Sequence, residues 1–186
     1  MIPSVQLVLL LRWKNNGVVA TVAHIFAEVA KTEEGRERLT NLQPPIALQL
    51  VNLLQQRVPD MIAEADGNSE TSGSIAVVSQ VCRALGNMCY EYGKVFLAIL
   101  NPVFVLSLTH IWFLLLSDRG RKCVLDAGGL PVLTLVLEKA FELAEGTKKK
   151  NIDQHCLLTL RTVATGFLLN LIPGSEKSTC VSIMFG

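Results

Sequence analysis

One helical pattern occurs three times in this chain, and it restricts the fold more than any other feature of the sequence. Apolar residues recur at intervals of three and four in "GVVATVAHIFAEVAK", "IAVVSQVCRALGNMCY" and "HCLLTLRTVATGFLLNLI", as on one face of an α-helix. Each segment follows a second apolar helix that starts near a proline, at Pro3, Pro45 and Pro131, and proline suits a first helical turn. The sequence therefore predicts an all-α fold.

Each of the three helices has a predicted apolar stripe. In the first helix we expect the stripe to consist of Val22, Ile25, Phe26 and Val29. In the second it is Val78, Val81, Cys82, Leu85, Met88 and Cys89. In the third it is Leu160, Val163, Ala164, Phe167, Leu168 and Leu171. These stripes predict which residues form the core.

The three helices are regularly spaced once one segment is set aside. Aligned through Glu28, Asn87 and Asn170, they lie 59 and 83 residues apart, and removal of residues 93–117 reduces the second interval to 58. The same removal brings two Gly-Arg pairs, at Gly35 and Gly120, to 60 residues apart. Residues 93–117 therefore behave as an insertion into a repeat.

A second segment, residues 57–74, is rich in glycine, serine and acidic residues, and we expect it to be a flexible solvated loop. Without it the first interval is 41 residues, within the roughly 40–47 residues of an armadillo or HEAT unit. We therefore predict an armadillo-repeat α-solenoid of about three repeats over residues 1–177, with an inserted apolar helix at 93–117. Residues 178–186 form an atypical tail.

The insertion contains the most apolar part of the chain. The stretch from Val95 to Leu116 contains no charged residue, and it is long enough to span a membrane. Asn101 and Pro102 near its middle weaken that interpretation. A membrane span would also separate the first two repeats from the third, although repeats need each other to bury a core. A retained intron, an alternative exon and a true membrane segment remain alternatives.

Composition argues against several classes of function. The net charge is +1 and 18% of residues are charged, so no nucleic-acid footprint is expected. The five cysteines form no metal-binding spacing, and Cys82 and Cys89 are expected to lie on a buried helix face. No catalytic motif is present. We predict a protein that is not an enzyme, with no metal site and no cofactor.

A solenoid instead offers a long binding groove formed by the third helix of each repeat. The alignment places Glu28, Asn87 and Asn170 in one column of this groove, with His24 and Arg83 in the neighbouring column. These five residues are the candidate partner-binding site. For the asparagines, hydrogen bonding to a partner backbone and anchoring of a helix end or loop are equal alternatives.

The chain resembles the armadillo family and, within it, the SmgGDS-type GDP-dissociation stimulators of Ras-like and Rho-like small GTPases. The resemblance rests on "IFAEVAK", "RALGNMCY" and "GRKCVLDAGG" and covers most of residues 2–177. The family's whole protein is much longer, so the chain looks like an N-proximal fragment. In the family, four residues separate Cys-Tyr from the next Gly-Arg, and excision of residues 93–117 restores that spacing as "CYEYDRGR".

The resemblance implies a function in guanine-nucleotide exchange. Such a protein binds small GTPases that carry a basic, prenylatable C-terminus and promotes GDP release without bond chemistry. It also implies a cytoplasmic location, with association to the endoplasmic reticulum or mitochondria. The alternatives are a generic armadillo scaffold for protein–protein interaction and, third, a protein anchored in a membrane through Val95 to Leu116.

Overall fold

The structure of the chain is a computed structural model that describes residues 4–65, 72–90, 119–146 and 154–171. The all-α prediction is confirmed, since the described residues form helices and no strands. The helices are α1 (Ser4–Leu10), α2 (Asn16–Val29), α3 (Glu33–Thr40), α4 (Ile46–Ala65), α5 (Ser74–Met88), α8 (Gly129–Gly146) and α9 (Gln154–Leu171). Residues 119–126 are helical as well.

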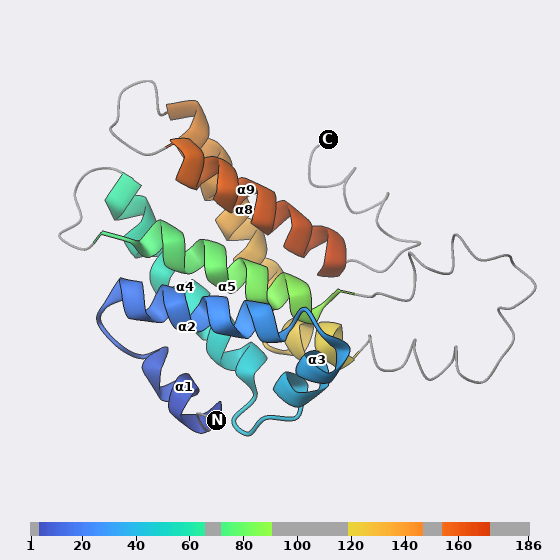
Figure 1. Cartoon of the computed structure of the whole chain (residues 1–186). Coiled ribbons are helices and arrows are strands. Elements are labelled where there is room, and N and C mark those ends of the chain that lie inside the picture. The colour runs from blue at the N-terminus through green and yellow to red at the C-terminus, as the bar shows by residue number, and fades with distance from the viewer. Residues whose placement is uncertain (1–3, 66–71, 91–118, 147–153, 172–186) are drawn as a thin grey trace, which may run out of the picture.

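The helices form two layers (Figure 1). In one layer α5 packs between α2 and α9, and in the other α4 and α8 lie against each other and against this first layer. Three segments far apart in the sequence therefore lie side by side. The core between the layers is centred on α5, where Val78, Val81, Cys82 and Leu85 have no exposed surface.

Helix starts follow from local chemistry. α4 begins directly after Pro45, and Pro131 lies in the first turn of α8, as predicted. The side chain of Asn15 accepts a hydrogen bond from the Val18 N–H at 3.1 Å, and Thr32 does the same for the Gly35 N–H at 3.1 Å. These side chains satisfy N–H groups that have no partner within the helix.

The predicted stripe is correct for α5, correct for α9 except that Val163 is only half-buried, and half correct for α2. Val22 and Phe26 are buried, whereas Ile25 and Val29 each remain 38% exposed. In the repeat alignment Ile25 corresponds to Ala84 and Phe167, which are buried. The difference arises because α5 and α9 each pack on a preceding helix of their layer, and α2 is the first helix of that layer.

The prediction of a loop over residues 57–74 is wrong for its first half. Residues 57–65 continue α4, with Pro59 inside the helix, and only residues 66–71 lie outside the described residues. The helix continues because Val58, Met61 and Ala65 extend its apolar stripe and are buried. The acidic composition concealed this periodicity.

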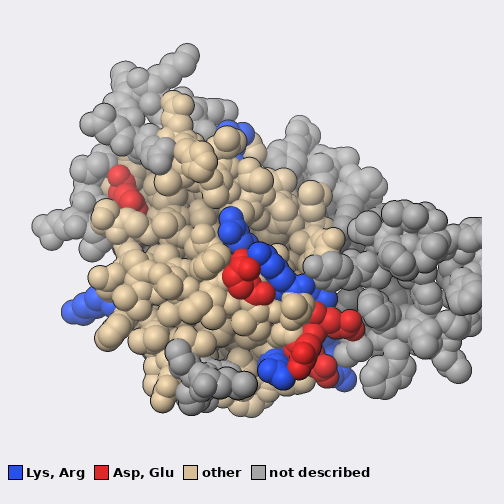
Figure 2. All heavy atoms as spheres, in the orientation of Figure 1, with Lys and Arg blue, Asp and Glu red and all other residues tan. Residues whose placement is uncertain are grey.

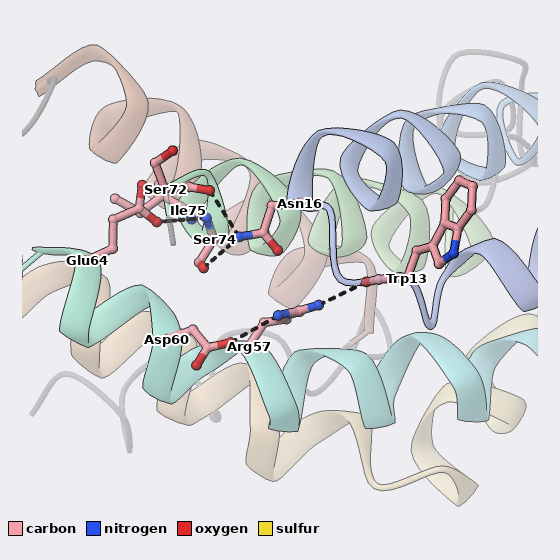
Figure 3. A network of polar contacts seen from close by, with 8 residues as sticks. All are labelled: Trp13, Asn16, Arg57, Asp60, Glu64, Ser72, Ser74 and Ile75. Atoms are coloured by element: carbon pink, nitrogen blue, oxygen red, sulfur yellow. Dashed lines mark hydrogen bonds and ion pairs between the residues drawn. The ribbon is translucent and has the colours of Figure 1, made fainter. Parts of the chain in front are cut away.

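Glu64, one of the acidic residues assigned to that loop, caps the next helix (Figure 3). Its Oε1 accepts the N–H of Gly73 at 2.7 Å, and its Oε2 accepts those of Ser74 at 2.7 Å and Ile75 at 3.2 Å. A carboxylate is favoured here because the first N–H groups of a helix are unpaired and carry partial positive charge. The Asn16 side chain joins in by donating to the Ser72 carbonyl at 3.0 Å. The end of α4 and the starts of α2 and α5 are thereby held together.

Residues 93–117 and the tail at 178–186 lie outside the described residues, as does the apolar stretch Val95 to Leu116. Among the residues that the structure describes, no helix is both long enough and apolar enough to cross a membrane.

The glycines of the two Gly-Arg pairs make equivalent contacts. A Cβ added to Gly35 would collide with the carbonyl oxygen of Val29, and one added to Gly120 would collide with that of Met88. Val29 and Met88 end α2 and α5 and hold the same position in the repeat alignment. Glycine is needed at both sites because the following helix starts in direct contact with the end of the preceding one.

A glycine-to-alanine pair tests this close contact. We expect Gly35→Ala to lower the free energy of unfolding by about 1–3 kcal/mol, because the new methyl group forces the backbones apart. Gly166→Ala in α9, where a Cβ would meet nothing within 4 Å, should raise it by about 0.5–1 kcal/mol through helix propensity. Urea unfolding followed by circular dichroism measures both. Equal effects at the two positions would contradict the contact.

A second pair of variants tests the Glu64 cap. We expect Glu64→Gln to destabilise the fold by about 1–2 kcal/mol, because the neutral amide has one acceptor oxygen for the three N–H groups. The matched control, Glu37→Gln on the exposed side of α3, should change stability by less than about 0.5 kcal/mol. Thermal unfolding of both variants gives the comparison, and a Glu64 variant as stable as the control would refute the cap.

Candidate partner-binding face

The five predicted site residues all lie on the layer formed by α2, α5 and α9. His24 and Glu28 come from α2, Arg83 and Asn87 from α5, and Asn170 from α9. Figure 2 shows this face in the orientation of Figure 1: most of it is uncharged, and acidic and basic side chains gather at its middle and lower right.

His24, Glu28 and Arg83 come together across α2 and α5. The Lys31 Nζ lies 2.6 Å from Glu28 Oε1, and this hydrogen-bonded pair lowers the pKa of Glu28, with smaller electrostatic contributions from the nearby side chains of His24 and Arg83. His24 Nδ1 also lies 3.3 Å from Gln80 Oε1 of α5. We call these five residues (His24, Glu28, Lys31, Gln80 and Arg83) the charged patch.

The two asparagines of the predicted column occupy a different environment. Asn87 Nδ2 donates to the Ala27 carbonyl at 2.9 Å, and Asn170 Nδ2 donates to the Gly86 carbonyl at 3.0 Å. Both side chains are half-buried. The sequence is compatible with two roles for these asparagines, partner binding and helix anchoring. The observed bonds are those of helix anchoring, because each asparagine connects its helix to the preceding helix of the layer.

Each accepting carbonyl is left unpaired by its own helix. At the end of α2 the Lys31 N–H donates to Glu28, three residues back, at 3.2 Å, so it does not take the α-helical partner Ala27. At the end of α5 the Tyr90 N–H donates to Asn87 at 3.2 Å in the same way. A tighter last turn therefore frees one carbonyl per helix, and the next helix supplies its hydrogen bond.

Sequence reasoning used the Gly-Arg pairs only as landmarks and missed the role of their arginines. Arg36 Nη1 donates to the carbonyls of Ala30 and Lys31, both at 3.1 Å, at the end of α2. Arg121 is 6% exposed; its Nε donates to the Asn170 carbonyl at 3.3 Å, and burial lowers its pKa. A cation at a helix C-terminus is favourable. The recurrence of the pair was the signal available in the sequence.

The buried cysteines lie as predicted. Cys82 and Cys89 are buried, and burial raises the pKa of each thiol to about 12. Thiolate is the reactive form, so neither residue is set up as a nucleophile near neutral pH. Within the described ranges no group of three or more His, Cys, Asp or Glu side chains could hold a metal ion.

The chemistry of this face suits non-covalent binding. It combines an anion, two cations and an imidazole with exposed apolar residues on the same helix, Ile25 and Val29. Such a mixture suits a protein partner, since specific interfaces combine apolar area with complementary charge. Comparison of the chain with protein-family models, curated proteins and solved structures found no match.

The asparagine bond between helices is testable by removal. We expect Asn87→Ala to cost about 1–2 kcal/mol of stability, because the Ala27 carbonyl then stays buried without a donor. Asn52→Ala, at a half-buried position of α4, serves as the control and should be neutral or slightly stabilising, since alanine favours the helix. Chemical unfolding at constant pH distinguishes them. A neutral Asn87 variant would show that the bond contributes nothing.

Proposed function

We propose that this chain is an armadillo-type helical-repeat module that binds another protein. The supporting observation is the recurrence of one interface, in which an asparagine donates to a freed carbonyl from α5 to α2 and again from α9 to α5. The segments α3–α4–α5 and 119–126–α8–α9 supply two three-helix units, and α1–α2 supplies the end of a first. Stacked units of this kind present one extended surface.

The proposed partner class is a small GTPase of the Ras or Rho type. This part of the proposal rests on the resemblance carried by "RALGNMCY" and "GRKCVLDAGG". In such a mechanism the module binds the nucleotide-free GTPase more tightly than the GDP-bound form, and it weakens GDP binding by the same factor. No covalent step and no cofactor are required.

The charged patch is the part of the surface that we propose contacts the GTPase. Glu28 carries its carboxylate on the exposed face of α2, where it can attract a basic C-terminal segment. Arg83 and Lys31 next to it can pair with acidic groups of the folded domain. Charges at the rim of an interface chiefly set the association rate and the choice of partner.

A generic scaffold for peptides or helices is the second candidate, and one observation favours it. Within "RALGNMCY", Leu85, Gly86 and Met88 are buried, and Asn87 bonds to α2. This motif therefore serves the stacking of helices, which any armadillo-type scaffold needs, whatever its partner.

Nucleotide release separates the two candidates. With fluorescent GDP loaded on a panel of Ras-like and Rho-like GTPases, we expect the chain to accelerate release weakly, because it comprises only about three units. Glu28→Lys should reduce the effect by at least about threefold through charge reversal at the contact. Glu37→Lys on α3 is the matched control and should leave it unchanged.

Two outcomes would contradict the GTPase proposal. The first is the absence of any acceleration or binding across the panel while the chain still captures extended or helical peptides, which would establish the scaffold. The second is acceleration that Glu28→Lys and Glu37→Lys alter equally, since the charged patch would then have no special role.

A further inference from the structure

The outer edge of α9 repeats, in exposed form, an interface that the molecule already uses twice. In the repeat alignment its exposed residues correspond to a buried set on α5, where α9 packs. The corresponding positions on α2 are Asn16, Ala20, Ala23 and Ala27, where α5 packs. The set on α5 is Ile75, Ser79, Cys82 and Gly86, and the set on α9 is Leu158, Thr162, Thr165 and Leu169.

Exposure differs sharply among these equivalent positions. Ile75 is 6% exposed and Cys82 is fully buried, whereas Leu158 is 61% and Leu169 44% exposed. The four positions on α9 carry no charge, and Thr162 Oγ1 is already bound to the Leu158 carbonyl of its own helix at 2.9 Å. We call these four residues the α9 edge.

The backbone at this edge has the same acceptor as the two occupied interfaces. Leu169 corresponds to Ala27 and Gly86, whose carbonyls accept the asparagines of the next helix. On α2 and α5 a tightened last turn frees that carbonyl. On α9 the α-helical donor for that carbonyl is missing from the sequence, because residue 173, four positions after Leu169, is a proline and has no N–H.

Side-chain size at the edge indicates what would fit there. At the α5–α9 interface Gly86 meets Phe167, and a Cβ on Gly86 would lie 3.1 Å from Phe167 Cα. In a helix that packs on this edge, the residue facing this position lies three positions before the asparagine that donates to the carbonyl. In α9 these two residues are Phe167 and Asn170. The α9 edge has the large Leu169 at the position that Gly86 occupies on α5. A helix that packs on it therefore needs a small residue at the facing position, as α5 has Ala84 three positions before Asn87.

We propose that the α9 edge is a docking site for a partner α-helix that carries a small residue three positions before an asparagine. The helix packs its small residue against Leu169 and donates its asparagine amide to the Leu169 carbonyl. A second copy of this chain does not meet the requirement. Its α2 presents Ile25 and Glu28 at these two positions, and a carboxylate cannot donate a hydrogen bond to a carbonyl.

The test uses the full chain and a labelled peptide of residues 74–90, which carries Ala84 and Asn87, in fluorescence anisotropy under reducing conditions. We expect binding that weakens at least about tenfold when the peptide carries Asn87→Asp, since the amide donor is lost. Ala84→Phe in the peptide should weaken it similarly by collision with Leu169. On the chain, Leu169→Glu should abolish binding, and Leu135→Glu, at a 40% exposed position of α8, should preserve it.

Three results would overturn the proposal. One is no binding of the peptide to the folded chain. Another is binding that persists in Leu169→Glu, because the peptide would then occupy a different surface. The last is concentration-dependent dimerisation of the chain in sedimentation that Leu169→Glu removes, because a second copy would then cover the edge. Circular dichroism of the variants shows whether each remains folded, and Leu158→Glu provides a second edge variant if Leu169→Glu does not.

Discussion

Carbonyl groups at the C-terminal ends of α2 and α5 are the constraint on which the arrangement of the other helices depends. Each helix tightens its last turn and leaves one carbonyl, that of Ala27 or Gly86, without an N–H of its own. A buried carbonyl needs a donor, and in both cases an asparagine of the next helix in the layer supplies it. A glycine contact follows at both helix ends, and at the end of α2 an arginine donates to the last carbonyls as well. The order and spacing of the layer follow from these contacts.

The residues that make the chain resemble a family are therefore largely the ones that hold its helices together. Gly86 and Asn87 lie within the most specific motif, and both serve the α2–α5–α9 layer. Glu28, on the exposed side of α2, and the half-buried Arg83 of α5 take no part in these bonds between helices. The side chains that stack the helices and those exposed on the face thus come from the same helices.

Most of the helices could be predicted from the sequence, and two of the errors share one cause. The stripes of α5 and α9, the proline starts and the buried Cys82 and Cys89 follow from local periodicity. The pattern of Ile25 and Val29 matches that of α5 and predicts core positions, yet among the described helices none of that layer precedes α2. Glu64 lies in a segment whose glycine, serine and acidic content predicts a loop, yet it binds the N–H groups of α5. In each case the environment of the residue depends on a neighbouring helix that is distant in the sequence.

The sequence by itself determined that the chain is helical, which face of most helices is apolar and which positions repeat. These properties depend on residues within a few positions of one another, so they can be read along the chain. The tertiary structure alone decided that Asn87 and Asn170 bind carbonyls 60 and 84 residues away, and that His24, Glu28 and Arg83 form one patch. It also decided that Leu158 and Leu169 on the edge of α9 are exposed. Such contacts depend on which helices become neighbours, and periodicity specifies a face without specifying what packs against it.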